Sequence, residues 1–305
     1  MMKTIITSFV LIIFICGTLF AQTAKDYYER GKEKSRIGKY KEAILEYDKS
    51  IKINSSIGSA YRNRAFAKSQ IGNIKGALED YNNAIKNDPK DHISFLGRGS
   101  LFTKQKKYDS AIKDFTEAIQ LHPSSYLGYY LRGNLYLELE RFKEALLDYN
   151  KALLLNSSDP EIYFDRANTK LALNDIHSAI TDFSRVIELN PKDALAYRNR
   201  GIAKYSVGDY KGAIEDNNIS IKITPNDTKS YTCRGLAKTK LNDFQGALDD
   251  FSKVIKLEPN NSEAYYNKGI AEIILGQNQK GCQDLKKAKA LGHDRADEMI
   301  IRFCE

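Results

Sequence analysis

The sequence predicts an all-α fold in which antiparallel helix pairs stack side by side into a solenoid. Three observations favour this fold class. A period of 34 residues runs through most of the chain without insertion or deletion, each period reads as two helices joined by a short turn, and all six prolines fall at predicted helix boundaries. A single helix pair cannot bury its apolar face alone, so neighbouring pairs are expected to pack on one another.

The segment before the repeats, residues 1–21, has the pattern of a secretory signal peptide. A basic start at residues 1–3 precedes the apolar run IITSFVLIIFICGTLFA, which ends in small residues. We expect cleavage after Ala21, with Gln22 as the new N-terminus. The protein would then be exported to a periplasmic or extracellular compartment.

Two other roles for this segment remain open. The apolar run approaches the roughly 18–20 residues that a membrane span requires, so it could stay uncleaved as an anchor. Cys16 could instead carry a lipid anchor, although the two residues before it are larger than such processing prefers. We expect contact with a membrane only through this segment.

Eight repeats follow, over residues 22–295, and a small residue at position 8 of each repeat sets their alignment. These residues are Gly31, Ala65, Gly99, Gly133, Ala167, Gly201, Gly235 and Gly269. The repeats run over 24–57, 58–91, 92–125, 126–159, 160–193, 194–227, 228–261 and 262–295. Position 4 is aromatic in every repeat and position 20 is small. Small residues on both helices let the two backbones approach, and the aromatic side chains fill the space around them.

The other key positions are 24, 27 and 32. Position 24 is aromatic in six repeats, position 27 is small in most, and position 32 is proline in five. With these spacings, residues 24–295 resemble the tetratricopeptide repeat family. The resemblance implies a right-handed superhelical α-solenoid whose concave side is lined by the first helix of each repeat. Asn217 replaces the position-24 aromatic in repeat 6, so we expect looser packing of repeat 6 on repeat 7.

The last ten residues, 296–305, begin where a ninth repeat would start. Met299, Ile300 and Phe303 give them an apolar stripe, which predicts a C-terminal capping helix over the open end of repeat 8. Cys304 in this helix and Cys282 in the second helix of repeat 8 should lie close together. They are therefore candidates for a disulfide in an oxidising compartment, and two buried free thiols are the alternative.

Position 7 is basic in every repeat and position 23 is acidic in every repeat, although the family pattern prefers an apolar residue at position 7. The basic residues are Arg30, Arg64, Arg98, Arg132, Arg166, Arg200, Arg234 and Lys268. The acidic residues are Glu46, Asp80, Asp114, Asp148, Asp182, Asp216, Asp250 and Asp284. A guanidinium can bond a carboxylate at two points while its stem packs against aromatic rings. Because a site rarely recurs at a fixed spacing in every repeat, we predict a structural ladder of ion pairs.

The sequence predicts neither catalysis nor a cofactor. The histidines stand at unrelated repeat positions, without carboxylates or cysteines at metal-ligand spacing. No glycine loop of the phosphate-binding type is present, and the repeats fill the chain between the predicted signal peptide and the cap. We therefore expect no enzyme, no metal, no cofactor and no small-molecule substrate. The net charge of +8 is modest and scattered, which argues against a nucleic-acid partner.

The resemblance implies that a peptide segment of a partner protein binds in the concave groove. Repeats 1 and 2 place mostly polar and basic residues there, whereas repeats 4 to 6 place aromatic and apolar residues together with asparagines. The predicted contact residues are Tyr130, Asn134, Phe164, Asn168, Leu195, Arg198, Ile202 and Tyr205. Apolar anchors with a few orienting polar groups suit a peptide site. The expected function is a non-enzymatic protein–protein interaction scaffold, and the alternative is an envelope assembly factor or chaperone that holds client proteins transiently.

Overall fold

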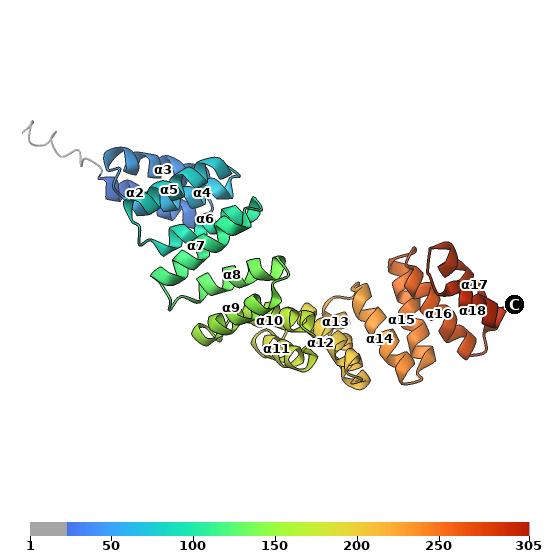
Figure 1. Ribbon diagram of the computed structural model, residues 1–305. Coiled ribbons are helices and arrows are strands. Elements are labelled where there is room, and N and C mark those ends of the chain that lie inside the picture. Colours follow the sequence, from blue (N-terminus) through green and yellow to red (C-terminus); the bar gives the residue numbers. More distant parts are fainter. Residues whose placement is uncertain (1–22, 305) are drawn as a thin grey trace, which may run out of the picture. The chain divides into compact units, whose positions relative to one another are not determined.

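A computed structural model describes residues 23–304 (Figure 1). Helices connected by short turns make up this range, and no strand occurs within it. The predicted all-α solenoid of antiparallel helix pairs is confirmed. The predicted signal peptide lies outside the described residues.

Each repeat contributes two helices. The first helices are α2 (Ala24–Arg36), α4 (Gly58–Gln70), α6 (His92–Lys104), α8 (Tyr126–Glu138), α10 (Pro160–Ala172), α12 (Ala194–Ser206), α14 (Thr228–Lys240) and α16 (Ser262–Ile274). The second helices are α3 (Tyr40–Ile53), α5 (Ile74–Asn87), α7 (Tyr108–Leu121), α9 (Phe142–Leu155), α11 (Ile176–Leu189), α13 (Tyr210–Ile223), α15 (Phe244–Leu257) and α17 (Asn278–Ala290). A final helix, α18 (Ala296–Cys304), follows them.

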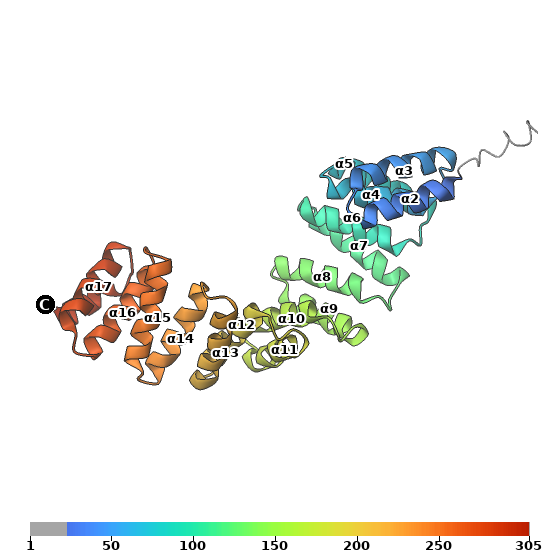
Figure 2. The same cartoon turned by 180° about the vertical axis from the view of Figure 1, so that it is seen from behind.

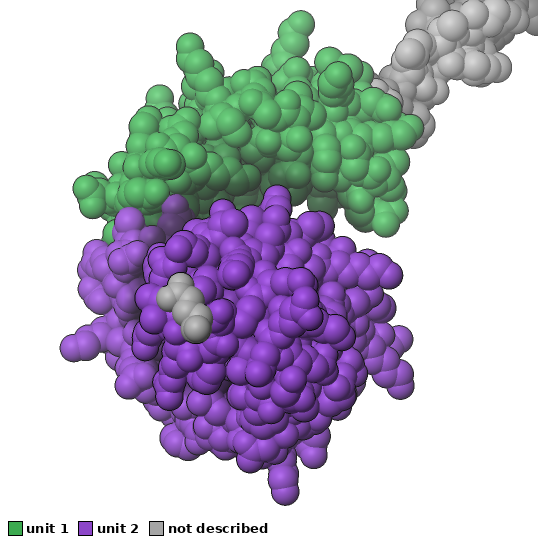
Figure 3. All heavy atoms as spheres, turned by 90° about the vertical axis from the view of Figure 1, so that its right-hand side faces the viewer, with its two compact units in different colours: residues 1–135 green, residues 136–305 purple. Residues whose placement is uncertain are grey.

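The chain divides into two compact units, residues 1–135 and residues 136–305, which Figure 3 shows in different colours. In unit 1, α2 packs on α3, α4 on α5 and α6 on α7, and adjacent pairs are in contact (Figure 2). In unit 2, α9 packs on α10, the helix pairs α10–α11, α12–α13, α14–α15 and α16–α17 follow, and α18 packs on α17. Each unit thus has its own series of stacked helices.

Residues with special backbone geometry mark the helix ends. Thr23 and Asp26 form a capping box at the start of α2, in which each side chain accepts a hydrogen bond from the backbone N–H of the other. The turn after the first helix needs a positive φ at position 15, which Gly208 adopts at 83°. In repeats 3 and 4, Lys106 and Glu140 take the same conformation, with φ of 58° and 56°. The turn geometry is therefore kept where glycine is missing.

Small residues bring the two helices of a repeat together. A Cβ atom added to Gly235 would lie 2.8 Å from Cε1 of Phe251, and the same distance holds between Gly99 and Phe115. Only glycine fits so close to these rings. The buried aromatic at position 24 therefore packs directly on the backbone of the first helix.

Candidate functional site

The exposed face of the first helices in unit 1 is hollowed by a pocket of about 510 Å³ between α4, α6 and the start of α8. We call it the apolar pocket. Its apolar wall comes from Phe66, Ile93, Leu96, Leu127 and Leu131. Ile93 is 48% exposed and Phe66 is 45% exposed, although both side chains are fully hydrophobic. A partner that covered this pocket would remove that surface from water.

The floor of the apolar pocket depends on one glycine. A Cβ atom on Gly97 would lie 2.4 Å from Cζ of Tyr81, so no larger residue could stand at this place in α6. The Tyr81 ring therefore reaches under α6, and its burial raises the pKa of the Tyr81 hydroxyl to about 12. The ring stays neutral at physiological pH and forms an apolar floor.

The rim of the apolar pocket carries its polar groups. Arg62 Nη1 lies 2.6 Å from Oδ1 of the buried Asp91, which also accepts a hydrogen bond from the Ser94 hydroxyl. His92 stacks on His122 with ring centroids 4.5 Å apart. Burial, with the neighbouring charges of His122 and Arg62, lowers the pKa of His92, so this ring is neutral at pH 7.

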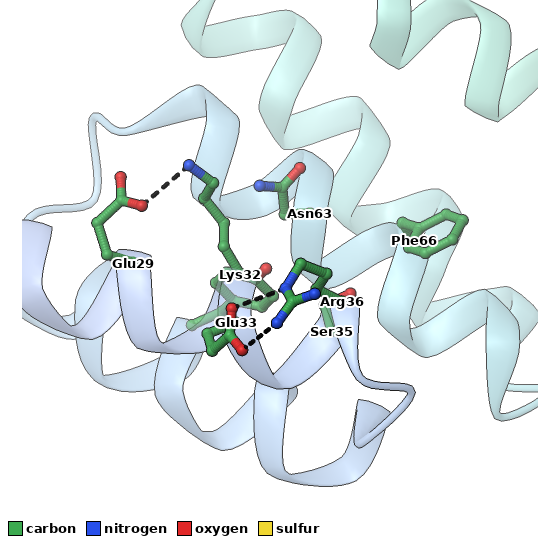
Figure 4. Close-up of a pocket in the computed structure, with 8 residues that line it drawn as sticks. Glu29, Lys32, Glu33, Ser35, Arg36, Asn63 and Phe66 are labelled. Atoms are coloured by element: carbon green, nitrogen blue, oxygen red, sulfur yellow. Dashed lines mark hydrogen bonds and ion pairs between the residues drawn. The ribbon is translucent and has the colours of Figure 1, made fainter.

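A second cavity of about 490 Å³, the polar pocket, adjoins the apolar pocket and shares Asn63 and Phe66 with it. Figure 4 shows its charged side chains on α2. Lys32 Nζ lies 2.9 Å from Glu29, and Arg36 makes two hydrogen bonds to Glu33. The cations that line this pocket are therefore paired within their own helix.

Unit 2 has a pocket of about 390 Å³ on the same kind of face, between α12 and α14. We call it the thiol pocket, because its lining includes Cys233 together with Ile202, Tyr205 and Leu236. Cys233 is a free cysteine that is only 6% exposed. Burial raises the pKa of its thiol to about 11, so the thiol is protonated and unreactive at pH 7.

The structure brings Ile202 and Tyr205, two of the predicted contact residues, together in the thiol pocket. Leu195 lies nearby on α12 and is 50% exposed. Arg198 is engaged in the protein itself, because its Nη1 atom lies 3.2 Å from Asp227. Phe164 packs edge-on against Phe183 in a core cluster, with ring centroids 5.6 Å apart. These two residues are therefore less available to a partner than the sequence predicts.

The other predicted contact residues occupy separate first helices. Tyr130 and Asn134 lie on α8, in unit 1, and Asn168 lies on α10, in unit 2. Sequence reasoning missed Phe66, Ile93 and Gly97, because it treated the start of the chain as polar and gave repeat 3 no role. The sequence contained the signal for both apolar residues. Ile93 stands at position 2 and Phe66 at position 9, the positions of the predicted contact residues Leu195 and Asn134.

The ladder aspartates of repeats 2, 3, 5, 6 and 7 are buried, and the arginines that bond them are partly buried. Arg166 shows the arrangement: Nε and Nη2 bond Asp182 at 2.8 and 2.7 Å, and Nη1 bonds Asn150 of the preceding repeat at 2.8 Å. Lys170 holds the same aspartate at 2.7 Å. The equivalent pairs are Arg64–Asp80, Arg98–Asp114, Arg200–Asp216 and Arg234–Asp250. Each of these guanidiniums joins two helices of its own repeat to the repeat before it.

The rung predicted between Arg132 and Asp148 falls on the division of the chain, since Arg132 belongs to unit 1 and Asp148 to unit 2. Within unit 1, Arg132 Nη1 donates to the Thr116 hydroxyl at 2.9 Å. Thr116 stands at position 25, which carries a hydrogen-bond acceptor in repeats 1 to 7. The acceptors at this position are Asp48, Asn82, Thr116, Asn150, Ser184, Asn218 and Ser252. Sequence reasoning missed this third partner, although the pattern is visible in the repeats.

The capping helix α18 buries Ala296 and Ile300 and is joined to α17 by a disulfide between Cys282 and Cys304. Ile300 is 7% exposed, whereas Phe303 is 42% exposed. Of the expected apolar stripe, Ile300 is therefore buried and Phe303 is exposed.

Within residues 23–304, no group of three or more His, Cys, Asp or Glu side chains is arranged to bind a metal ion. In the same range, no helix is both long and apolar enough to cross a membrane.

Family models match the chain in five places. One described as TPR repeat matches residues 133–174, and four described as tetratricopeptide repeat match residues 24–57, 93–125, 164–228 and 251–283. No curated protein sequence matches the chain at a significant level.

Solved structures resemble the chain along most of its length. YrrB, described as a TPR protein with an unusual peptide-binding site, is 22% identical with a TM-score of 0.59, and the match covers 63% of this chain and 98% of YrrB. The C-terminal part of a TPR protein from Cytophaga hutchinsonii is 17% identical with a TM-score of 0.67, covering 79% and 98%. Pseudomonas aeruginosa pilF is 19% identical with a TM-score of 0.61, covering 68% and 94%. At these identities the similarity shows the fold alone.

Proposed function

The chain belongs to the tetratricopeptide repeat family, and on this premise we propose that it is a non-enzymatic scaffold that binds a peptide segment of a partner protein on its first-helix faces. The observation that carries the proposal is the apolar pocket, where large hydrophobic side chains from successive first helices stay exposed. Such a pocket gives an extended peptide apolar anchor points. The polar groups beside it, such as Asn63 and Ser100, can bond the peptide backbone.

The buried charges support a scaffold as well. The ladder aspartates in both units are held by arginine, and several by lysine in addition, so their charge is used to fix the fold. A buried carboxylate that is held by two cationic partners is not open to a substrate. YrrB, one of the similar structures, is described as having a peptide-binding site, which agrees with a peptide as ligand.

Export is part of the proposal. The disulfide between Cys282 and Cys304 supports it, because such bonds persist in oxidising compartments such as the bacterial periplasm. We expect the protein isolated from its native cells to begin at Gln22. Mass spectrometry of the intact chain measures this, and a chain that keeps residues 1–21 would support an anchor instead.

Photo-crosslinking in the native compartment tests the scaffold. A photoreactive residue would replace Ile93 in the apolar pocket or Ile202 in the thiol pocket. A control would replace Leu147, which is 69% exposed on the second helix α9. We expect one partner at fixed stoichiometry from the pocket positions and none from Leu147. Many weakly bound proteins would favour the envelope chaperone. Crosslinks from Leu147 alone would contradict both functions.

A further inference from the structure

We infer that the apolar pocket of unit 1 takes a short apolar peptide segment that carries an aspartate or glutamate beside its apolar residues. This inference rests on the proposed function and adds the chemistry of the partner. The juxtaposition that carries it is an exposed hydrophobic wall beside the exposed cation Lys104, in a pocket whose described lining contains no Asp or Glu and whose other cation, Arg62, is already paired with Asp91.

The wall selects the apolar part of the ligand. Ile93, Phe66 and Leu127 are 48%, 45% and 39% exposed, and each comes from a different first helix. A cluster of this kind is unusual on a soluble surface and indicates a binding surface. Gly97 deepens the pocket because its missing side chain lets a ligand side chain approach the buried Tyr81 ring.

Lys104 selects the acidic part. It lies at the C-terminal end of α6 and is exposed. Arg62, at the other end of the pocket, is neutralised by Asp91, which lies 2.6 Å from it. His92, at the start of α6 beside Asp91, is neutral at pH 7, because its pKa is lowered. Positive charge beside low-dielectric walls attracts a negatively charged ligand.

The other two pockets lack this charge excess. In the polar pocket, Lys32 and Arg36 are each paired with a glutamate of α2. In the thiol pocket, the lining contains Lys229 and Glu258, so the two charges offset each other. An acidic ligand should therefore prefer the apolar pocket, with its carboxylate next to Lys104.

A library of random twelve-residue peptides displayed on phage tests this inference against the purified protein. We expect enrichment of sequences with several apolar residues and at least one Asp or Glu. Ile93→Asp should weaken the selected peptides by about tenfold or more, because one buried aliphatic contact is lost. Lys104→Glu should shift the enrichment toward peptides that carry Lys or Arg.

The repeats provide matched controls in unit 2. Leu195 occupies the same repeat position as Ile93 and is 50% exposed, and Lys240 occupies the same position as Lys104. Lys240→Glu, together with Leu147→Asp on the second helix α9, should leave the selected peptides unaffected, and Leu195→Asp tests whether the peptides bind unit 2 instead. Circular dichroism checks that the variants fold, and Leu127→Asp serves as a second pocket variant.

Each result decides between the proposals. Peptides that are lost with Leu195→Asp but not with Ile93→Asp would keep the scaffold function and overturn the site in unit 1. Peptides that need Ile93 but stay acidic with Lys104→Glu would overturn the acidic ligand. If no peptide were enriched by any form of the protein, the scaffold function would fail as well.

Discussion

Each ladder arginine combines three contacts in one guanidinium. In repeat 5, Arg166 bonds Asp182 at two points and Asn150 of the preceding repeat at a third, while its side chain is 18% exposed. Its guanidinium also lies over the Tyr163 ring, 5.5 Å from the centroid. Planar geometry and weak hydration make arginine suitable for such a half-buried site. The residue therefore acts as a structural connection between repeats.

We expect Arg166→Leu to lower the free energy of unfolding by about 3 kcal/mol, the lower end of the range for breaking a buried pair, because Lys170 still holds Asp182. Thermal melting followed by circular dichroism measures the change. Arg141→Leu is the control, since Arg141 pairs with Glu144 at the surface and should change stability by less than about 1 kcal/mol. Unchanged stability together with lost partner binding would make Arg166 a site residue.

Repeat 8 places an acidic residue beside its ion pair. Lys268 replaces arginine and contacts both Asp284 and Glu272, and Glu272 stands at position 11, where five other repeats carry a lysine. Glu272 is 3% exposed, and its Oε2 atom has no hydrogen-bond partner among the described residues. Burial first, and the charge of Asp284 in addition, raises the pKa of Glu272 above its ordinary value of 4.5.

A raised pKa means that the folded chain binds this proton more tightly than the unfolded chain does. Stability from this group is therefore present at low pH and falls as the pH rises above 4.5 through the folded-state pKa. We expect Glu272→Gln to raise the melting temperature at pH 7.5, by an amount equivalent to about 1 kcal/mol, and to change it less at pH 4.5. Melts of both proteins across this range measure the difference, and an equal effect at both pH values would refute the assignment.

At the scale of the helix pair, the turn after the first helix is kept by backbone conformation. Position 15 has a positive φ in every repeat, whether it is Gly72 at 80° or Lys106 at 58°. No atom lies within 4 Å of a Cβ built on Gly72, so a side chain there would not clash with its surroundings. The only cost in free energy would come from the positive φ. The pairs thus keep one geometry although their turn sequences differ.

We expect Gly72→Ala to destabilise unit 1 by about 1 kcal/mol, the cost of the left-handed conformation for an L-residue. Lys106→Ala is the matched control, because the lysine already has this conformation and alanine adds no further strain. Urea denaturation of the three proteins provides the comparison. Equal losses in both variants would show that side-chain contacts, and not φ, decide stability at the turn.

The capping helix depends on its covalent connection. Only Ala296 and Ile300 of α18 are buried, which is little apolar area for a helix of nine residues. The disulfide joins residues with a sequence separation of 22. Closing a loop of that size lowers the entropy of the unfolded chain, which stabilises the folded state by about 3 kcal/mol. We expect Cys304→Ser to expose α18 and α17 to hydrogen exchange and to leave α12 of repeat 6 unchanged, because a repeat contacts only its neighbours.

A reducing agent should have the same effect on the parent protein and no additional effect on the Cys304→Ser variant. The free thiol of Cys233 stays buried in both cases. Loss of protection along all of unit 2 would contradict local unfolding of the cap.

At the scale of the whole molecule, regular spacing made the fold predictable. The period, the small residues and the ladder positions specify which side chains face each other, since every repeat gives the same geometry. The apolar pocket could not be predicted in the same way. Its depth depends on Gly97 and the reach of Tyr81 from the neighbouring repeat, which no single repeat contains. The division of the chain at 135/136 is equally invisible, because the period continues through it.

Arg198 shows a second limit of prediction from the sequence, because a side chain that was predicted to contact a partner is already paired within the protein. Its repeat position faces the groove, but the sequence does not reveal that Asp227, at the end of the same repeat, can reach it. Arg62 and Asp91 stand at the same two positions in repeat 2 and make the same pair. A repeat position therefore predicts direction, whereas the availability of a side chain depends on partners at the ends of the helices.

Stability along unit 2 should be uneven at repeat 6. Asn217 takes the place that Phe183 and Phe251 occupy in the equivalent helices, and it is completely buried. Its amide nitrogen bonds the Ala213 carbonyl at 2.7 Å, while its oxygen has no hydrogen-bond partner among the described residues. A buried polar atom without a partner destabilises the fold, and a small side chain adds little apolar contact between repeats.

We therefore expect faster hydrogen exchange in α13 than in α11 and α15, the matched second helices on either side of it. Asn217→Leu, which copies the fully buried Leu285 of repeat 8, should slow the exchange of α13 and raise stability by about 1–2 kcal/mol. Exchange measured by mass spectrometry tests both expectations. Uniform protection of the three helices would mean that the ladder through Arg200 and Asp216, and not the position-24 side chain, determines how firmly repeat 6 is held.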